Sequence, residues 1–286
     1  MELIFLALCF ITLALIYFFA ENRLLLTRKY KIRLGTDNVR SLKIVQISDI
    51  HKSNKNNKII SRTKQLKPDI ILLTGDMISR SVRDMSGIDN LTHSLSDLCP
   101  VYACPGNHEL DLPSEIYEKY KTIMQKNGVI YLENRRTAFE RNGVKINIAG
   151  ASLRKSVYRD DKGGYKRLHK YISEELEEDI GPKAGFTLLL AHNPLCAKAY
   201  SQWGADIVFC GHIHGGAVRL PLLGGLLSPE RKFLPEYSKG IYHIGKTEMI
   251  VSGGIGKPRL FNPPEIVFCE LIGNNKKILK IANQIV

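Results

Sequence analysis

The sequence has no cysteines in a C-x-x-C spacing, no internal repeat and no low-complexity segment. Its six cysteines lie mostly in or beside apolar runs, as in Val208-Phe209-Cys210, so we expect buried, reduced thiols and no disulfide framework. Basic runs such as Lys276-Lys277 lack the interleaved aromatic residues of a nucleic-acid groove. Nucleic acid is therefore not an expected partner.

The composition is that of a folded, basic protein. Hydrophobic residues make up 44% of the 286 residues, which is enough for a sizeable core. The net charge of +13 favours anionic partners, namely nucleic acid, an acidic membrane surface or phosphorylated substrates. Most of the lysines are interpreted as solvated surface residues.

Charge is almost absent from the N-terminus. Between Leu3 and Ala20 only Thr12 is clearly polar, and these 18 residues would form roughly 27 Å of helix. We expect an uncleaved membrane anchor. A cleaved signal peptide is the alternative, but it requires a basic start and a small-x-small cleavage site, whereas this chain has Met1-Glu2 and Phe18-Phe19-Ala20.

No basic residue precedes the apolar segment, and five follow it closely: Arg23, Arg28, Lys29, Lys31 and Arg33. The positive-inside rule then predicts a single-pass protein whose catalytic domain is cytoplasmic. The predicted organisation is a membrane anchor over residues 1–22, a basic connector over 23–40 and one folded domain over 41–286.

Apolar runs of strand length alternate with helical patterns after residue 41, which favours a substantially parallel sheet. Three consecutive strands follow, at 129–132, 136–140 and 144–149, with Asn142-Gly143 as a hairpin turn. The charged stretch 153–182 is predicted to be either a cap over the site or an exposed helix. A single α/β domain with two packed sheets accounts for this pattern.

Polar motifs follow five of the predicted strands directly. They are Asp49-x-His51, Gly75-Asp76, Gly106-Asn107-His108-Glu109, His192 and Gly211-His212-x-His214. Open α/β sheets place their ligand sites beyond the carboxyl ends of the strands. Imidazole, carboxylate and amide groups without thiolates suit Mn, Fe or Zn, so the set predicts a divalent metal site.

This series of motifs resembles the calcineurin-like metallophosphoesterase superfamily, over roughly residues 42–272. The runs 211–221 and 261–265 more narrowly resemble the membrane-associated phosphodiesterase branch that includes bacterial UDP-diacylglucosamine pyrophosphatases. The chain departs from the usual pattern at Lys52-Ser53, where a Leu-Gly pair often stands, at Ala217, and over 150–153, where a frequent acidic residue is missing. These departures bear on substrate specificity.

The resemblance implies a four-layer α/β/β/α sandwich with two mixed sheets and a binuclear metal centre. By motif position, one ion would be held by Asp49, His51 and His214. The other would be held by Asn107, His192 and His212. Asp76 would bridge both ions, and His108 would be the acid near the leaving group. Two divalent ions, Mn with Zn or Fe as alternatives, would hold a bridging hydroxide for in-line attack.

The predicted function is a membrane-tethered phosphodiesterase or pyrophosphatase, acting on UDP-2,3-diacylglucosamine or another lipid-linked or nucleotide phosphate. Expected partners are therefore the lipid bilayer and a phosphorylated substrate. The alternatives are a tethered phosphatase of soluble phosphoesters and a non-catalytic metal-binding scaffold. Arg154 and Arg219 are the candidate substrate contacts, each with a solvated surface role as its alternative.

Overall fold

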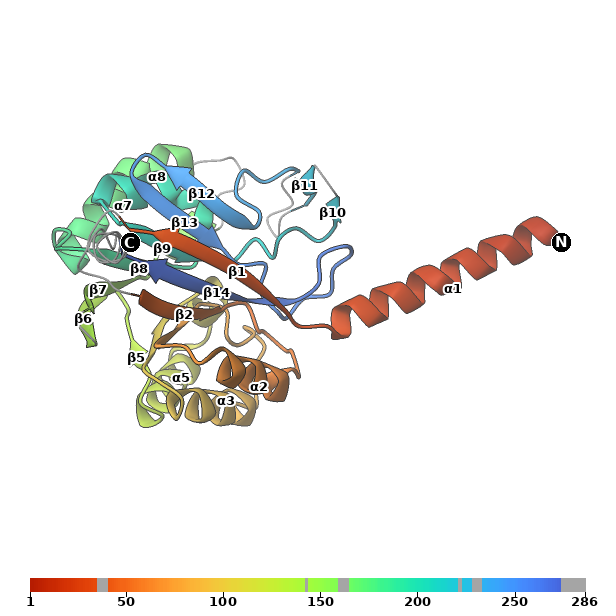
Figure 1. The fold of residues 1–286 in the computed structure, drawn as a ribbon, viewed down its shortest axis with the longest axis horizontal. Coiled ribbons are helices and arrows are strands. Elements are labelled where there is room, and N and C mark those ends of the chain that lie inside the picture. The colour runs from red at the N-terminus through yellow and green to blue at the C-terminus, as the bar shows by residue number, and fades with distance from the viewer. Residues whose placement is uncertain (35–40, 142–143, 159–164, 221–222, 228–232, 274–286) are drawn as a thin grey trace, which may run out of the picture.

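The computed structural model describes residues 1–34, 41–141, 144–158, 165–220, 223–227 and 233–273. Helix α1 (Glu2–Arg23) projects away from the folded domain, with most of its side chains exposed (Figure 1). Its segment Ile4–Arg23 has a mean hydropathy of 2.3 and is long and apolar enough to cross a membrane. A signal sequence has the same properties, so the helix fits either role.

The first sheet has the strand order β1-β14-β2-β3-β4-β5. Its strands are β1 (Leu26–Arg33), β2 (Ser41–Ile47), β3 (Ile70–Thr74), β4 (Val101–Cys104), β5 (Ile130–Tyr131) and β14 (Glu265–Ile272). Strands β2 to β5 are parallel, whereas β14 runs antiparallel to β2. Every residue of β3 and β4 is buried, as expected for parallel strands covered on both faces.

The second sheet has the order β12-β13-β9-β8-β7-β6. Its strands are β6 (Arg135–Arg141), β7 (Val144–Ala151), β8 (Thr187–Ala191), β9 (Ile207–Cys210), β12 (Gly240–Ile244) and β13 (Thr247–Val251). Strands β7, β8, β9 and β13 are parallel, and the two outer pairs are antiparallel. The small hairpin of β10 (Arg219–Leu220) and β11 (Gly224–Gly225) lies apart from both sheets.

Helices cover the outer face of each sheet, so the domain has four layers (Figure 1). The first sheet is covered by α2 (Asn56–Leu66), α3 (Ser86–Ser96) and α5 (Ser114–Lys126), and α4 (Asn107–Leu110) follows β4. The second is covered by α6 (Lys155–Tyr158), α7 (Tyr165–Ile180) and α8 (Ala197–Trp203), with the short 3₁₀ helix η1 (Pro194–Cys196). A third apolar cluster fills the space between the sheets. The predicted α/β/β/α sandwich is confirmed.

Two stretches differ from their sequence-based predictions, one because it contains a strand and the other because its helix is packed on one face. The predicted connector contains β1, which pairs in parallel with β14 along its whole length. The charged 153–182 stretch contains α7, which buries Ile172, Leu176 and Ile180 against the second sheet. Helix α7 is therefore part of the outer layer. The predicted turn at Asn142-Gly143 lies outside the described residues, although β6 and β7 do pair on either side of it.

The cysteines behave as predicted in the described part of the chain. All six are free thiols, and five of them are buried, Cys9 of α1 being the exposed one. Burial raises the pKa of Cys104 and Cys269, to about 12 for Cys269. These thiols pack as small hydrophobic side chains.

Candidate metal centre

The five polar motifs converge at one edge of the sandwich. Residues 49–51, 76 and 107–108 follow β2, β3 and β4 of the first sheet, and residues 192 and 212–214 follow β8 and β9 of the second. The parallel registers align these strand ends: Ile47 lies beside Leu73, Thr74 beside Cys104, and Leu190 beside Phe209. Two sheets packed face to face thus deliver seven predicted ligands to one place.

The backbone at the centre adopts an unusual conformation. Five of the predicted ligands have positive φ angles of 52° to 70°: Asp49, His51, Asp76, His212 and His214. Residues with a Cβ rarely adopt this left-handed conformation, and each instance costs of order 1–3 kcal/mol. Such strain concentrates at functional sites, because the surrounding structure has to enforce it. The five residues therefore mark this edge as a site.

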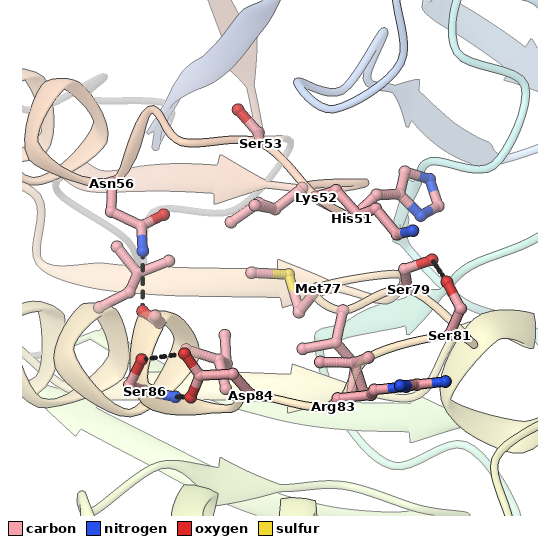
Figure 2. A pocket seen from close by; sticks show the side chains of 16 residues that line it. His51, Lys52, Ser53, Asn56, Met77, Ser79, Ser81, Arg83, Asp84 and Ser86 are labelled. Carbon is pink, nitrogen blue, oxygen red and sulfur yellow. Dashed lines mark hydrogen bonds between the residues drawn. The ribbon is translucent and has the colours of Figure 1, made fainter.

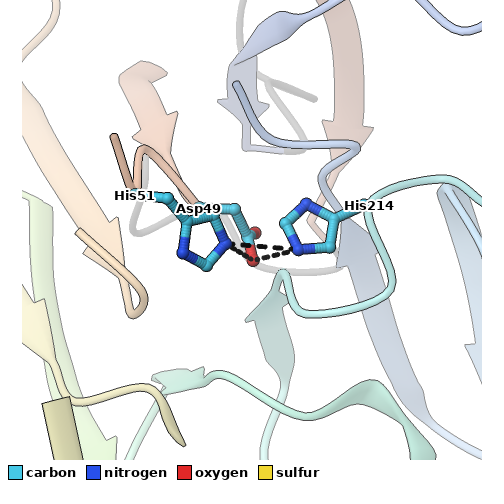
Figure 3. A group of neighbouring side chains, drawn as sticks. All are labelled: Asp49, His51 and His214. Carbon is cyan, nitrogen blue, oxygen red and sulfur yellow. Dashed lines mark hydrogen bonds and ion pairs between the residues drawn. The ribbon is translucent and has the colours of Figure 1, made fainter. Parts of the chain in front are cut away.

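Asp49, His51 and His214 form the first cluster of potential ligand atoms (Figure 3). The Nε2 atoms of the two histidines lie 3.3 Å apart, and Asp49 Oδ1 lies 4.0 Å from His51 Nε2 and 3.6 Å from His214 Nε2. Burial lowers the pKa of His51 to about 3 and that of His214 well below its usual value. Both imidazoles are therefore neutral at physiological pH, the form that binds metal ions.

Asp76, His192 and His212 form the second cluster. His192 donates its Nδ1 hydrogen to the carbonyl oxygen of Thr74 at 2.7 Å, which fixes the tautomer and leaves Nε2 as the ligand atom. This Nε2 is buried and has no hydrogen-bond partner among the described residues. It lies 3.3 Å from Asp76 Oδ2.

Asp76 lies between these two clusters and forms a third one with His51 and His108. Its Oδ2 is 3.7 Å from His51 Nε2 as well as 3.3 Å from His192 Nε2. Burial raises the pKa of Asp76, but the adjacent His192 outweighs this and holds the pKa well below its usual value. Burial likewise lowers the pKa of His192, while Asp76 raises it to about 10. The pair thus holds a proton that a metal ion would displace.

Asn107 and His108 complete the set. The Oδ1 atom of Asn107 is buried without a hydrogen-bond partner among the described residues, which is the state expected of a ligand atom awaiting its ion. His108 Nδ1 accepts a hydrogen bond from the backbone N–H of Arg80 at 3.2 Å, so Nε2 carries the proton. That Nε2 faces the centre, 3.9 Å from Asp76 Oδ2. Burial lowers the pKa of His108 to about 4.

Glu109 holds the turns of the first sheet together. Its buried carboxylate accepts hydrogen bonds from the backbone N–H groups of Asp76 and Gly106, both at 2.8 Å, and of Ile78 at 3.0 Å. Gly106 is required here because a Cβ at this position would collide with the Asp76 carboxylate. Glu109 stands in a motif that the sequence singles out, but no role was predicted for it.

Arg259 supports the loops that follow the strands of the second sheet. It is 2% exposed and donates through Nη1 to the carbonyl oxygens of His214, at 3.0 Å, and of Gly253. Asn262 donates to the same His214 carbonyl at 2.7 Å and to that of Gly216 at 2.9 Å. Neither residue was predicted to have a role. The run 261–265, which resembles the membrane-associated phosphodiesterase branch, was the one signal in the sequence that pointed to this loop.

The C-terminal end of α1 is attached to this supporting loop. Asn22 exchanges two hydrogen bonds with the backbone of Arg259, donating at 2.8 Å and accepting at 3.0 Å. Glu21 accepts from the backbone N–H of Phe261 at 2.9 Å, and the ring of Tyr17 lies 5.5 Å from that of Phe261. The apolar helix is therefore fixed beside the loop that holds His214.

The two predicted substrate contacts lie in different surroundings. The Arg154 side chain is 74% exposed and forms an ion pair with Glu175 of α7 at 2.8 Å. Arg219 donates to Ser238 Oγ at 3.2 Å and to the carbonyl oxygen of Gly215, next to His214, at 3.4 Å. Arg219 thus contacts the loop that holds His214, whereas Arg154 points to α7. Their roles in substrate binding stay predictions.

Tyr158 is a further residue that sequence reasoning missed. Its ring packs edge-on against that of His212, with centroids 5.3 Å apart, and lies 6.2 Å from that of His192. Its hydroxyl group is buried and has no hydrogen-bond partner among the described residues. No motif marks it, because Tyr158 follows a charged stretch that lacks a clear strand pattern.

This arrangement defines a metal-dependent phosphoric ester hydrolase: two sheets bring imidazole and carboxylate groups together in numbers that fit a metal site. The chain belongs to the calcineurin-like phosphoesterase family, whose sequence profile matches residues 42–216. The resemblance drawn from the motifs is confirmed.

The chain is also similar to individual proteins. The chain is 25% identical to the uncharacterized metallophosphoesterase YkoQ of Bacillus subtilis, over 81% of this chain and 84% of the relative. It is 24% identical to the phosphodiesterase YaeI of Escherichia coli, over 85% and 87%. It is 25% identical to the UDP-2,3-diacylglucosamine pyrophosphatase LpxG of Chlamydia muridarum, over 86% and 88%. Among solved structures, the phosphopantetheinyl hydrolase PptH of Mycobacterium tuberculosis aligns with a TM-score of 0.48 at 14% identity, over 79% of this chain and 92% of that one.

Proposed function

We propose that the chain hydrolyses a phosphodiester or pyrophosphate bond of a lipid-linked or nucleotide-bearing substrate at a membrane surface. The observation that carries this proposal is the convergence of carboxylate and imidazole ligands at the merged strand ends of the two sheets. UDP-2,3-diacylglucosamine is the candidate substrate, because the relative LpxG is a UDP-2,3-diacylglucosamine pyrophosphatase.

The site would hold two divalent ions, with Mn as the expected metal and Zn or Fe as alternatives. Their proposed ligands fall into the sets predicted from sequence: Asp49, His51 and His214; Asn107, His192 and His212; and Asp76 shared by both. The buried Asn107 Oδ1, which has no hydrogen-bond partner among the described residues, supports this fit. When bound, such ions supply an activated water molecule and neutralise charge on the phosphoryl oxygens.

His108 is proposed to assist the leaving group. Its Nε2 hydrogen points into the centre while Nδ1 is fixed by the backbone of Arg80. A lowered pKa makes the imidazolium scarce in the free protein. The negative charge of a bound phosphate ester would favour that cation, in which a proton on Nδ1 replaces the hydrogen bond from Arg80 and the Nε2 proton becomes available to the leaving group.

The surroundings of His214 support a substrate with an apolar part. A cavity of about 100 Å³ lies beside His214, and among its lining residues are Ile213, Ala217, Leu227 and Pro258. The supporting loop that includes Pro258 also holds the end of α1. A phosphate group attached to a lipid would thus reach the centre from the side on which the apolar helix leaves the domain.

The membrane assignment is tested separately from the chemistry. We propose that residues 1–22 are a retained single-pass anchor and that the folded domain faces the cytoplasm. N-terminal sequencing of the mature protein would give Met1 or Glu2, whereas a start near Glu21 would overturn retention. Protease treatment of intact cells should leave the domain uncut, and its digestion would overturn the orientation.

The chemistry is tested with the full chain in proteoliposomes. Chelation should abolish turnover, Mn should restore it, and elemental analysis should find two ions per chain. Full activity without metal would overturn the proposal. Lipid pyrophosphates and nucleotide diesters should be hydrolysed with a higher kcat/KM than simple monoesters. The reverse order would favour a tethered phosphatase of soluble phosphoesters.

A further inference from the structure

A second and larger cavity, of about 360 Å³, opens from the metal centre on the side of His51 (Figure 2). Its walls are the segment that follows β2, over residues 50–56, and the segment from Met77 to Leu91, which leads from β3 into α3. This volume is within the range of small-molecule sites. We refer to it as the α3 pocket.

The α3 pocket is lined by both apolar and polar side chains. The apolar residues are Ile50, Met77, Ile78, Val82, Ile88 and Leu91. The polar side chains at its edges include Lys52 and Arg83, which are exposed and reach in from opposite sides in Figure 2. The hydroxyl groups of Ser79 and Ser81 lie 3.3 Å apart at a third side.

The two cations are available to a ligand. Among the described residues, no carboxylate lies within ion-pair distance of Lys52 or Arg83. One carboxylate, that of Asp84, lines the pocket. It accepts hydrogen bonds from the backbone N–H of Ser86 at 2.9 Å and from the Ser86 hydroxyl group at 2.7 Å. The rim therefore attracts an anionic group in addition to the one held at the metal centre.

The pocket also contains an acceptor that lacks a donor. Asn56 donates its amide N–H to the carbonyl oxygen of Gly87 at 2.7 Å, which joins α2 to the start of α3. Its Oδ1 is then directed away from Gly87, is buried, and has no hydrogen-bond partner in the described part of the chain. Asn56 therefore contributes a wall of the pocket, because a ligand in the pocket cannot reach an oxygen that is itself buried.

We propose that the α3 pocket binds the polar half of the substrate, a nucleoside or sugar phosphate, with Lys52 and Arg83 as specificity-determining residues. The cavity takes the ring, and the two cations contact the phosphate that is not attacked. This deepens the proposed function and rests on it. It also gives a role to Lys52-Ser53, where the chain departs from its family pattern.

Product binding tests the pocket without turnover. Isothermal titration of the Mn-loaded full chain compares uridine monophosphate, adenosine monophosphate, glucose 1-phosphate and inorganic phosphate. The ring-bearing phosphates should bind at least about tenfold more tightly than inorganic phosphate. The nucleotide and sugar arms then identify which ring the pocket takes. Equal affinities for all four probes would overturn the proposal.

The cations are tested with the double variant Lys52→Ala/Arg83→Ala. Its affinity for the preferred ring-bearing phosphate should fall about 5- to 30-fold, as expected when two exposed charge contacts are lost. The matched control is Arg62→Ala/Lys64→Ala, which removes the same charge from the exposed face of α2 and should leave that affinity within twofold. Equal losses of affinity in both double variants would show that only net charge matters, which would overturn the assignment of Lys52 and Arg83 as specificity-determining residues.

Kinetics separate this proposal from the proposed function. In the double variant the kcat/KM for a nucleoside diphosphate ester should fall relative to that for bis(4-nitrophenyl) phosphate, and the control should keep the wild-type ratio. An unchanged ratio would overturn the role of the two cations even if the enzyme is active. A wild-type protein that binds the nucleotide but hydrolyses neither ester would instead remove the proposed function and leave the pocket intact.

Discussion

The two halves of the metal centre are supported by buried side chains of opposite hydrogen-bonding character, the carboxyl group of Glu109 and the guanidinium group of Arg259. In the half supplied by the first sheet, the buried acid Glu109 accepts three hydrogen bonds from backbone N–H groups. In the half supplied by the second sheet, the buried base Arg259 donates to backbone carbonyl groups, including that of His214. Left-handed turns leave backbone groups unpaired, and one buried side chain with several acceptor or donor atoms satisfies more than one of them.

The two supports also differ in where they come from. Glu109 belongs to the same motif as Asn107 and His108, so the first half carries its own support. Arg259 lies 45 residues beyond His214 and is held by the end of α1 through Asn22. Burial lowers the pKa of Arg259 only to about 10, so it remains a cation at neutral pH. The second half therefore depends on a residue far along the chain and on the apolar helix.

Replacing the residue that the two halves share should have the largest effect. Asp76→Asn keeps the shape of the side chain but removes the charge proposed to serve both ions. We expect kcat/KM to fall more than about 10³-fold, beyond the loss of one charge-stabilising donor, and elemental analysis to find both ions depleted. Asp97→Asn on the exposed surface is the control and should change neither. A variant that keeps both ions and its activity would refute the shared role.

His108 lies between the halves and is not a proposed ligand. The effect of replacing it on the rate of hydrolysis should therefore depend on the substrate. His108→Ala should slow hydrolysis of an alkyl phosphate ester by about 10²–10⁴-fold, the usual cost of losing a general acid. A nitrophenyl ester, whose leaving group needs no proton, should lose far less, and the metal content should not change. Equal losses on the two esters would show that His108 acts on the phosphoryl group or the fold instead.

Much of the fold and of the proposed centre is predictable from sequence because both rest on local signals. Strand β3 (Ile70–Thr74) coincides with a run of apolar residues, and Pro113 directly precedes the amphipathic helix α5. The predicted ligands converge because each stands just beyond such a strand. Strand β1 was missed because an edge strand can keep basic residues in solvent, so its sequence is that of a polar linker.

The supports and the pocket are not predictable in the same way. Arg259 is a basic residue among many, and only the folded chain shows it buried against the carbonyl oxygen of His214. The α3 pocket forms between two segments that are far apart in sequence, so neither segment shows a signal of its own. Arg259 and the α3 pocket depend on contacts between residues that are distant in sequence, so only the structure reveals them.

Replacing Arg259 or Glu109 with a neutral side chain should affect the two ions differently. Arg259→Met should weaken one ion about 10–100-fold, the usual effect of removing a residue that orients a ligand, because only His214 loses its support. Glu109→Gln should weaken both ions, since Glu109 positions Asp76, which both share. Metal titrations that resolve two binding steps measure this, and thermal unfolding checks that each variant folds. The same pattern in both variants would contradict the division into halves.

The smallest effect is expected at Asn22, where the apolar helix meets the second half. Asn22→Ala removes two hydrogen bonds to the backbone of Arg259, and each such bond contributes about 0.5–1.5 kcal/mol net. Alanine also favours the helix more than asparagine does, which offsets part of the loss. We therefore expect the ion at His214 to bind about two- to tenfold more weakly, the equivalent of roughly 0.4–1.4 kcal/mol. The other ion should be unaffected.

The control for Asn22 is Asn90→Ala, the same change at an exposed position of α3. Hydrogen exchange gives a readout that does not depend on the metal: the amide groups of Arg259 and Phe261 should exchange faster in Asn22→Ala and not in Asn90→Ala. If both variants match the wild type in exchange and in metal affinity, the end of α1 touches the loop without supporting it. If Asn22→Ala alone changes, the apolar helix is part of the structure that holds His214, and removing it to make a shorter protein would weaken one half of the centre.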